Sequence, residues 1–398
     1  MTNNVVARCV TTTTYGQGSY GGQCLLLSQG GSDAVVISGL VMTNCGSIVT
    51  SDSSVNTVPP LIRRSGNYSV EDSYFGNNRM SFAIGANKTY SMFMPDDGGG
   101  ESSTPGVFKN VTFSDNIVKA RPLKNSVGQA AIGIVGGPHT PQTLVNCTFL
   151  DNQAIGFEGD LTCYASKGVV SATFVNPNYN AIGVANSTFI GDNTAPDVLL
   201  VNPRKENFVN VVNSIFKNTL DDDANAPLRV VGNFAANPFN LIHSSVNAMD
   251  VVPDDVNAVG LEIDTILFEQ EEKSVAAGSM PVFRAASSSG GVTNGVDVAS
   301  HATGFAYKLA GESAPWQQLN TAQTGTITPV GPIADALNAN RTYGSFTRGA
   351  LQGLSTAAET GHTLVVHKIT RSAGTAPPSS KLCLWRKISP VSRPRPVR

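Results

Sequence analysis

The stretch LVNCTFLDN, Leu144–Asn152, decides the fold, because nearly the same phrase occurs six times in the chain. Each phrase has a leading apolar residue, then in most copies an Asn or Asp, a small residue and an aromatic residue. Aligned on the aromatic position, the copies are VISGLVMTN (36–44), VEDSYFGNN (70–78), FKNVTFSDN (108–116), LVNCTFLDN (144–152), VANSTFIGD (184–192) and VVNSIFKNT (211–219). The aromatic position holds Val41, Phe75, Phe113, Phe149, Phe189 and Phe216. A repeat at intervals of roughly 30 to 40 residues predicts a solenoid.

The spacing within the phrase requires a bend. Leu144 lies five positions before Phe149, and a flat strand would place two such residues on opposite faces. A helix would need spacings of three, four or seven. The residue three before the aromatic is Asp72, Asn110, Asn146, Asn186 or Asn213 in five copies. Asn and Asp tolerate the left-handed conformation, so a bend there would turn both apolar residues toward one interior.

The other positions of the phrase and the segments between phrases complete a coil. The residue two before the aromatic is small, namely Gly39, Ser73, Val111, Cys147, Ser187 or Ser214. The closing residue, at Asn44, Asn78, Asn116, Asn152 and Asp192, is expected to start the next turn. Apolar runs at 130–137, 168–175, 197–201 and 228–232 are typical of buried parallel strands. Stacked coils would place Phe on Phe and Asn on Asn, with hydrogen-bonded amide ladders.

The predicted fold is therefore all-β, a right-handed parallel β-helix (solenoid) followed by a C-terminal irregular β capping region. The right hand follows from the general preference of parallel crossovers. We divide the chain into an N-terminal start or incomplete first coil (1–34), the β-helix repeats (35–247), C-terminal coils with the capping region (248–352) and an incomplete module or disordered basic tail (353–398).

The repeat resembles those of bacterial surface proteins with parallel β-helices, including the polymorphic outer-membrane proteins. The later segments IDTILF (263–268), YKLAGESAP (307–315) and DALNANRTYGSFTRGALQ (335–352) resemble the closing segments of the choice-of-anchor Q family. The residues that carry this match are Asp264, Phe268, Leu309, Ser313, Pro315, Asp335, Arg341, Gly349 and Ala350. The resemblance implies a capping region that closes the open end of the solenoid, which repeat proteins need for solubility.

Composition and charge favour an extracellular or cell-surface protein. Charged residues make up only 14% of the chain, well below the usual share of a soluble globular protein. Residues 1–10 lack the features of a signal peptide, and we expect the sequence to begin late. The last 31 residues, from Lys368, carry eight basic residues and no acid. We interpret them as a tail rather than as a nucleic-acid contact.

The cysteines do not predict a metal site. None of the six has CxxC or Cys/His spacing. Cys9 and Cys24 would pair only in an oxidising compartment, whereas Cys147 lies at a small-residue position of the repeat and is expected to pack in the core.

Candidate chemistry is sparse. Pectate-lyase-like sites need several carboxylates for Ca²⁺ and an Arg or Lys base, and the chain lacks the Asn-Thr-Asp, His-Gly and Arg-Ile-Lys signatures of pectin hydrolases. Its acidic groups Asp96 and Asp97, and Asp221, Asp222 and Asp223, lie in Gly- or Asn-rich stretches that we interpret as solvated loops. A structural Ca²⁺ at these residues is the alternative, and no other cofactor and no catalytic residue is predicted.

Three functions remain open at this stage. The leading hypothesis is a non-enzymatic, secreted or surface-exposed β-helix that acts in adhesion and contacts extracellular glycan, cell-surface or matrix components. It predicts a monomer without a membrane span, since no run approaches the roughly 20 apolar residues that spanning requires. The alternatives are a carbohydrate-active β-helix enzyme, of polysaccharide lyase or glycosidase type, and a phage tailspike-like protein, which would be a trimer.

Overall fold

The computed structural model is an all-β protein in which no described residue is helical. It describes residues 5–8, 10–13, 25–26, 35–49, 62–63, 68–84, 89–94, 106–122, 128–136, 142–156, 163–167, 170–173, 181–191, 197–201, 208–218, 228–231, 239–242, 244–246, 259–260, 267–275, 278–286, 306–307, 317–318, 335–337 and 349–351. The chain divides into one unit at Met1–Thr356 and a second at Ala357–Arg398. All described residues belong to the first unit.

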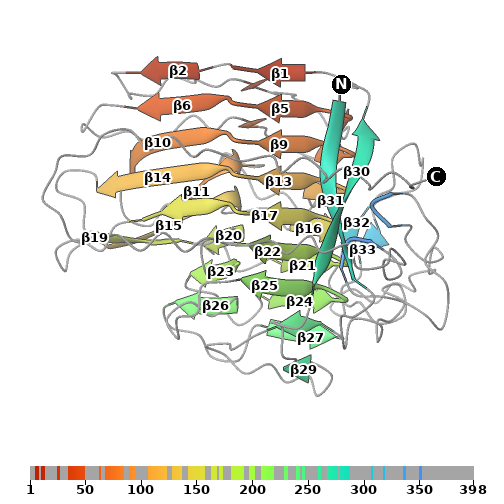
Figure 1. Cartoon of the computed structure of the whole chain (residues 1–398). Helices are drawn as coiled ribbons and strands as arrows, with labels where there is room; N and C mark the ends of the chain where they lie inside the picture. The colour runs from red at the N-terminus through yellow and green to blue at the C-terminus, as the bar shows by residue number, and fades with distance from the viewer. Residues whose placement is uncertain are drawn as a thin grey trace, which may run out of the picture. The chain divides into compact units, whose positions relative to one another are not determined.

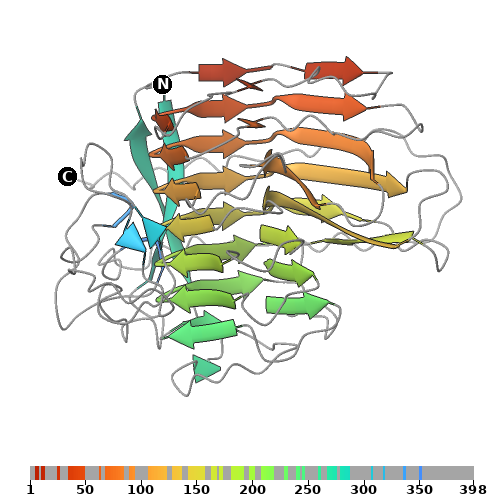
Figure 2. The same ribbon diagram turned by 180° about the vertical axis from the view of Figure 1, so that it is seen from behind.

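Four parallel sheets form the body of this unit, and each coil of the chain adds one strand to several of them (Figures 1 and 2). Sheet A contains β4 (Val35–Ser38), β8 (Tyr68–Glu71), β12 (Gly106–Lys109), β16 (Gln142–Val145), β21 (Ala181–Ala185), β24 (Phe208–Val212) and β27 (Phe239–Ile242). Sheet B contains β1 (Val5–Ala7), β5 (Val41–Thr43), β9 (Tyr74–Gly76), β13 (Thr112–Ser114), β17 (Thr148–Leu150), β22 (Thr188–Gly191), β25 (Ile215–Asn218), β28 (Ser245–Val246) and β29 (Val259–Gly260).

The other two sheets complete the coils. Sheet C contains β2 (Val10–Thr13), β6 (Gly46–Val49), β10 (Arg79–Ile84), β14 (Ile117–Pro122) and β18 (Gln153–Ile155). Sheet D contains β3 (Leu25–Leu26), β7 (Ile62–Arg63), β11 (Thr89–Met94), β15 (Gly128–Gly136), β20 (Val170–Thr173), β23 (Val198–Val201) and β26 (Leu228–Val231), and β19 (Cys163–Lys167) also pairs with β15. The apolar runs between the phrases coincide with β15, β20, β23 and β26. The predicted all-β parallel β-helix is confirmed.

The bend between sheets A and B lies where the repeat predicts it. Asp72, Asn110, Asn146, Asn186 and Asn213 all adopt the left-handed conformation, with φ between 46° and 54°. The strand before each bend belongs to sheet A and the strand after it to sheet B. Leu144 and Phe149 are both fully buried in one core, because the bend at Asn146 turns both side chains to the same side.

The aromatic column fills that core. Phe113 stacks on Phe149 with ring centroids 4.9 Å apart, and Phe149 stacks on Phe189 at 4.5 Å. Phe75 and Phe216 extend the column at its two ends, at 5.2 Å and 4.7 Å from their neighbours. The predicted stacking of Phe on Phe is confirmed, and burial of these rings supplies much of the hydrophobic stabilisation of the coils.

The first copy of the phrase requires a correction of one residue. Phe75 pairs in register with Met42, not with Val41. Gly39 has a φ of 66° and is the bend residue of this coil, a conformation that glycine adopts without steric cost. Met42 therefore points into the core, whereas Val41 lies in a separate cluster on the outer face of sheet B.

The closing residues of the phrase also differ from the prediction. The bend between sheets B and C is formed by the residue before the closing Asn: Asn77, Asp115 and Asp151 have φ between 51° and 55°. The closing residues Asn78, Asn116 and Asn152 are instead fully buried inside the coil. In the first copy Asn44 itself is the bend, in the fifth copy Gly191 takes this role, and Asp192 lies outside the described residues.

The buried closing residues form an amide ladder. Asn116 Nδ2 donates to Phe75 O and to Asn152 Oδ1, both at 2.9 Å, and its Oδ1 accepts from the backbone and side-chain nitrogens of Asn78. The Asn116 amide thus joins three consecutive coils. Burial of an amide costs little when its hydrogen bonds are satisfied in this way.

The C-terminal region lies along the side of the solenoid. β30 (Phe268–Val275) and β31 (Gly278–Ala285) form an antiparallel hairpin, and β32 (Ala306–Tyr307) pairs with β33 (Gln317–Gln318). Side chains of the hairpin pack on Val41 near one end of sheet B and on Ile215 farther along it. The hairpin crosses the coils (Figure 1). The described residues of the implied capping region therefore lie against sheet B, along the side of the solenoid.

Candidate functional site

Side chains that lie immediately before the aromatic position point outward from sheet B and meet the C-terminal region. Thr112 Oγ1 donates to Pro281 O at 2.8 Å, and Thr188 Oγ1 accepts from the backbone nitrogen of Ala350 at 3.0 Å. The recurrence of Thr next to a buried aromatic residue was the available indication that this face is covered.

The segment around Gly349 is one place where the chain docks on sheet B. Gly349 N donates to Asn213 O, and its φ is 91°. A Cβ at this residue would lie 2.9 Å from Thr188 Oγ1 and 3.0 Å from Ile215 Cδ1. Of the residues that carry the resemblance to the choice-of-anchor Q family, Phe268, Asp335, Gly349 and Ala350 are described. Asp264, Leu309, Ser313, Pro315 and Arg341 lie outside the described residues.

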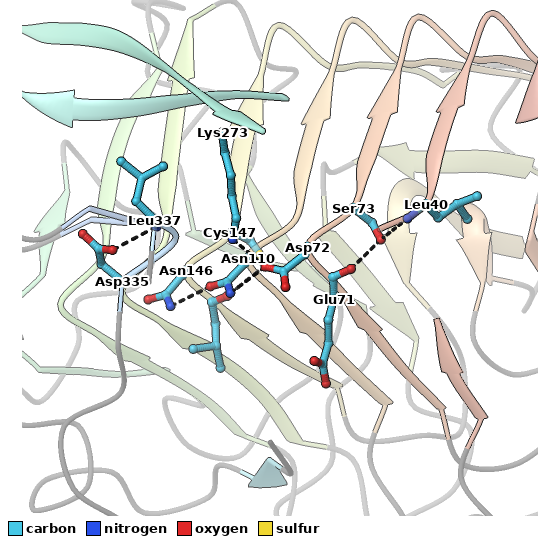
Figure 3. Close-up of polar contacts among 11 residues, drawn as sticks. Leu40, Glu71, Asp72, Ser73, Asn110, Asn146, Cys147, Lys273, Asp335 and Leu337 are labelled. Atoms are coloured by element: carbon cyan, nitrogen blue, oxygen red, sulfur yellow. Dashed lines mark hydrogen bonds and ion pairs between the residues drawn. The ribbon is translucent and has the colours of Figure 1, made fainter. Parts of the chain in front are cut away.

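A second amide ladder follows the bends between sheets A and B and ends at an ion pair (Figure 3). Asn146 Nδ2 donates to Asn110 Oδ1, and Asn110 Nδ2 donates to Asp72 Oδ1, both at 2.9 Å. Lys273 Nζ of the hairpin also contacts Asp72 Oδ1, at 2.5 Å. In the preceding coil the bend residue is Gly39, which has no side-chain oxygen that could accept a hydrogen bond from residue 72. An acceptor-only carboxylate at Asp72 suits that position better than an amide with an unused donor.

The predicted ladder is interrupted farther along. Asn213 Nδ2 donates to Asn186 Oδ1 at 3.1 Å, whereas Asn186 Nδ2 has no hydrogen-bond partner among the described residues. The bend residues therefore form two ladder segments rather than one continuous column.

The ion pair is the polar contact that holds the hairpin to the bends. The side chain of Lys273 is 9% exposed and that of Asp72 is 35% exposed, so the lysine is the partner that folding desolvates most. We expect Lys273→Met to loosen the hairpin. Because water can still reach Asp72, the free energy of unfolding should fall by about 1 kcal/mol rather than by the larger amount typical of a fully buried pair.

Hydrogen exchange of the β30–β31 amides measures this effect. In Lys273→Met the amides of the hairpin should exchange faster while those of β13 and β17 keep their protection. Lys109→Met, which removes a lysine from sheet A, is the matched control and should leave the hairpin unchanged. Equal hairpin exchange in the wild type and in Lys273→Met would show that the ion pair does not fasten it.

Two of the titratable groups with perturbed pKa values, Tyr74 and Asp115, meet at the corner between sheets B and C. The Tyr74 hydroxyl lies 3.0 Å from Ser114 Oγ, and Ser114 Oγ donates to Asp115 Oδ2 at 3.0 Å. We call Tyr74, Ser114 and Asp115 the corner triad. Tyr74 can reach across to the next coil because Gly76 has no side chain: a Cβ there would lie 2.4 Å from the tyrosine hydroxyl oxygen.

Burial governs the electrostatics of the corner triad. Desolvation raises the pKa of Asp115, and the Ser114 hydrogen bond and the Arg79 guanidinium oppose this shift. Desolvation also raises the pKa of Tyr74. The Ser114 hydrogen bond opposes this shift, whereas the nearby Asp115 and Glu272 carboxylates add to it. A carboxyl with a raised pKa beside a hydroxyl chain is an arrangement that general acid catalysis can use. No local sequence pattern indicates this triad, because its members lie in two coils.

The acidic residues proposed from the sequence as Ca²⁺ ligands, Asp96, Asp97, Asp221, Asp222 and Asp223, lie outside the described residues. Within the described ranges, no group of three or more His, Cys, Asp or Glu side chains is arranged to hold a metal ion. The same ranges contain no helix of the length and hydropathy that would cross a membrane.

Cys45 and Cys147 are core residues. Both thiols are buried and form no disulfide, and Cys147 packs in the main core, which confirms the prediction for it. Burial raises the pKa of the Cys147 thiol to about 12. The thiol therefore stays protonated and is a poor nucleophile.

The outer face of sheet C is the second feature that can bind a ligand. Arg79, Lys119 and Gln153 project from it and are exposed, as are Ile48 and Ile155, at 37% and 42%. We call the outward side chains of β2, β6, β10, β14 and β18 the sheet C flank. No known protein family, curated protein or solved structure matches the chain significantly.

Proposed function

We propose that the protein is a non-enzymatic, secreted or cell-surface β-helix that contacts extracellular glycan or matrix through a side of its solenoid. The observation that supports this most is the sheet C flank, where side chains from successive coils stand in register and Arg79, Lys119, Gln153 and Ile155 are exposed. Rigid parallel strands hold such side chains at a regular spacing of about 4.8 Å. A regular row of this kind suits a polymer with a regular repeat. The likeness of the repeat to bacterial surface proteins supports the same proposal.

The test separates binding from turnover. Full-length protein is applied to an array of immobilised polysaccharides, and each bound polymer is then incubated with the protein in solution and measured for chain length. We expect retention on some polysaccharides with unchanged chain length. Failure to bind any glycan or matrix preparation would overturn the proposal.

A carbohydrate-active enzyme is the second candidate, and the corner triad is the observation that favours it. Asp115 would serve as the proton donor, because burial keeps its carboxyl protonated to higher pH, and Ser114 and Tyr74 would position it. If the protein does shorten a polysaccharide, Asp115→Asn should lower kcat by about 10²-fold or more. Asp151→Asn, at the equivalent bend of the next coil, is the matched control and should retain activity.

A phage tailspike-like protein is the third candidate. It predicts a stable trimer, whereas the surface-protein proposal predicts a monomer. Sedimentation velocity of the full chain at micromolar concentration distinguishes the two.

A further inference from the structure

The sheet C flank has an asymmetric charge. Its strands contribute Arg79, Lys119 and Arg121 and contain no Asp or Glu in the described residues. Among all described residues five large apolar side chains are exposed, and three of them, Val10, Ile48 and Ile155, belong to these strands. Apolar side chains that are exposed beside cations on one face of a rigid sheet suit a ligand-binding surface.

The flank is organised in columns that cross the coils. Ile48, Ser81, Lys119 and Ile155 are in register in four consecutive strands, and their side chains share one face because all lie at the same parity. A ligand that follows this column therefore runs along the axis of the solenoid and meets one side chain per coil.

The nearest acids do not neutralise this column. Asp115 lies at the corner, accepts from Ser114 and faces Arg79. Asp151 Oδ1 lies only 2.1 Å from where a Cβ of Gly191 would be, so its carboxylate lies over the bend of the next coil. Both acids stay at the edge of the flank, and Lys119 in the central column has no acidic neighbour on the described strands of the sheet.

We propose, on the basis of the proposed function, that the ligand of the sheet C flank is a linear acidic polysaccharide lying along the solenoid axis. The basic side chains pair with its carboxylate or sulfate groups, and the isoleucines contact the apolar faces of its sugar rings. Charge complementarity selects an acidic polymer over a neutral one.

The experiment measures binding of full-length protein to polygalacturonate, dextran sulfate and uncharged dextran at low and high salt. Lys119→Glu reverses the central charge of the flank. Lys109→Glu makes the same change on β12 of sheet A in the same coil and is the matched control. We expect Lys119→Glu to weaken binding to an acidic polymer by about tenfold or more at low salt, with a smaller effect at high salt. The control should stay within about twofold.

The other outcomes are distinguishable. Equal weakening by both variants would show that net charge, not the flank, attracts the polymer. Equal affinity for dextran would overturn the acidic ligand but leave glycan binding in place, and equal affinity for single-stranded DNA would overturn the choice of a polysaccharide. Absence of binding to every polymer would overturn the proposed function itself. Circular dichroism and thermal unfolding verify that both variants are folded.

Discussion

Phe149→Ala should lower the free energy of unfolding by about 3–5 kcal/mol. The ring lies in the middle of the aromatic column, fully buried, with Phe113 and Phe189 stacked on its two faces. Its removal loses the transfer free energy of the ring and both stacking contacts. The neighbouring rings cannot close the gap, because the hydrogen bonds of sheet B fix the distance between coils.

Urea unfolding followed by circular dichroism measures this loss. Ile155→Ala in the same coil removes an exposed apolar side chain and should change stability by no more than about 0.5 kcal/mol. A loss below about 1 kcal/mol in Phe149→Ala would mean that the column carries little of the stability, and the described packing of the core would then be wrong.

Asp197→Asn should stabilise the protein at neutral pH. Asp197 is fully buried, and neither of its carboxyl oxygens has a hydrogen-bond partner among the described residues. Desolvation raises the pKa of Asp197 well above the ordinary value of 3.8. The native state therefore binds the proton more tightly than the unfolded chain. A tenfold tighter proton affinity in the native state costs about 1.4 kcal/mol of stability once the pH exceeds the native pKa.

The direction of the pH dependence follows from this shift. Well below pH 3.8 Asp197 is protonated in both states and has no linkage effect. As the pH rises from 3.8 to the raised native value, the unfolded state loses its proton first, so the wild type loses stability. An asparagine does not titrate. The stability difference between Asp197→Asn and wild type should therefore grow with rising pH and vanish at acid pH.

Denaturant unfolding at several pH values between 3 and 8 measures that difference. Asp335→Asn is a suitable comparison, because Asp335 is also fully buried but its Oδ1 accepts from Leu337 N. That variant should be destabilised rather than stabilised, since the backbone contact is weakened. A difference for Asp197→Asn that stays constant across the pH range would contradict the raised pKa.

The regular part of the fold could be predicted because each coil repeats the same local chemistry. An Asn or Asp in the left-handed conformation resolves the odd spacing between Leu144 and Phe149, and five copies indicate the same position. The first copy was aligned one residue out, because Val41 and Met42 are both apolar. Gly39 forms the bend in place of an Asn or Asp, so the sequence pattern alone does not show which of the two side chains faces the core.

The candidate site could not be predicted for the opposite reason. Lys273 meets Asp72 across 201 residues of sequence, and no local pattern records such a contact. The corner triad joins two coils through Tyr74. The tyrosine side chain has room to reach the next coil only because residue 76 is a glycine. Asp197 is the first residue of an apolar run, a position where an Asp is expected to lie in solvent just before the strand. In the structure the packing of sheet D buries it.

The lateral position of the hairpin has a consequence for how the molecule unfolds. Coils that touch only their nearest neighbours can fray one at a time from either end, and such a stack melts gradually. Here one two-stranded element packs on Val41 and also on Ile215, which lie in coils far apart along the stack. Neither of these coils can detach without releasing the same brace, so the coils that it spans should open together in a single cooperative transition.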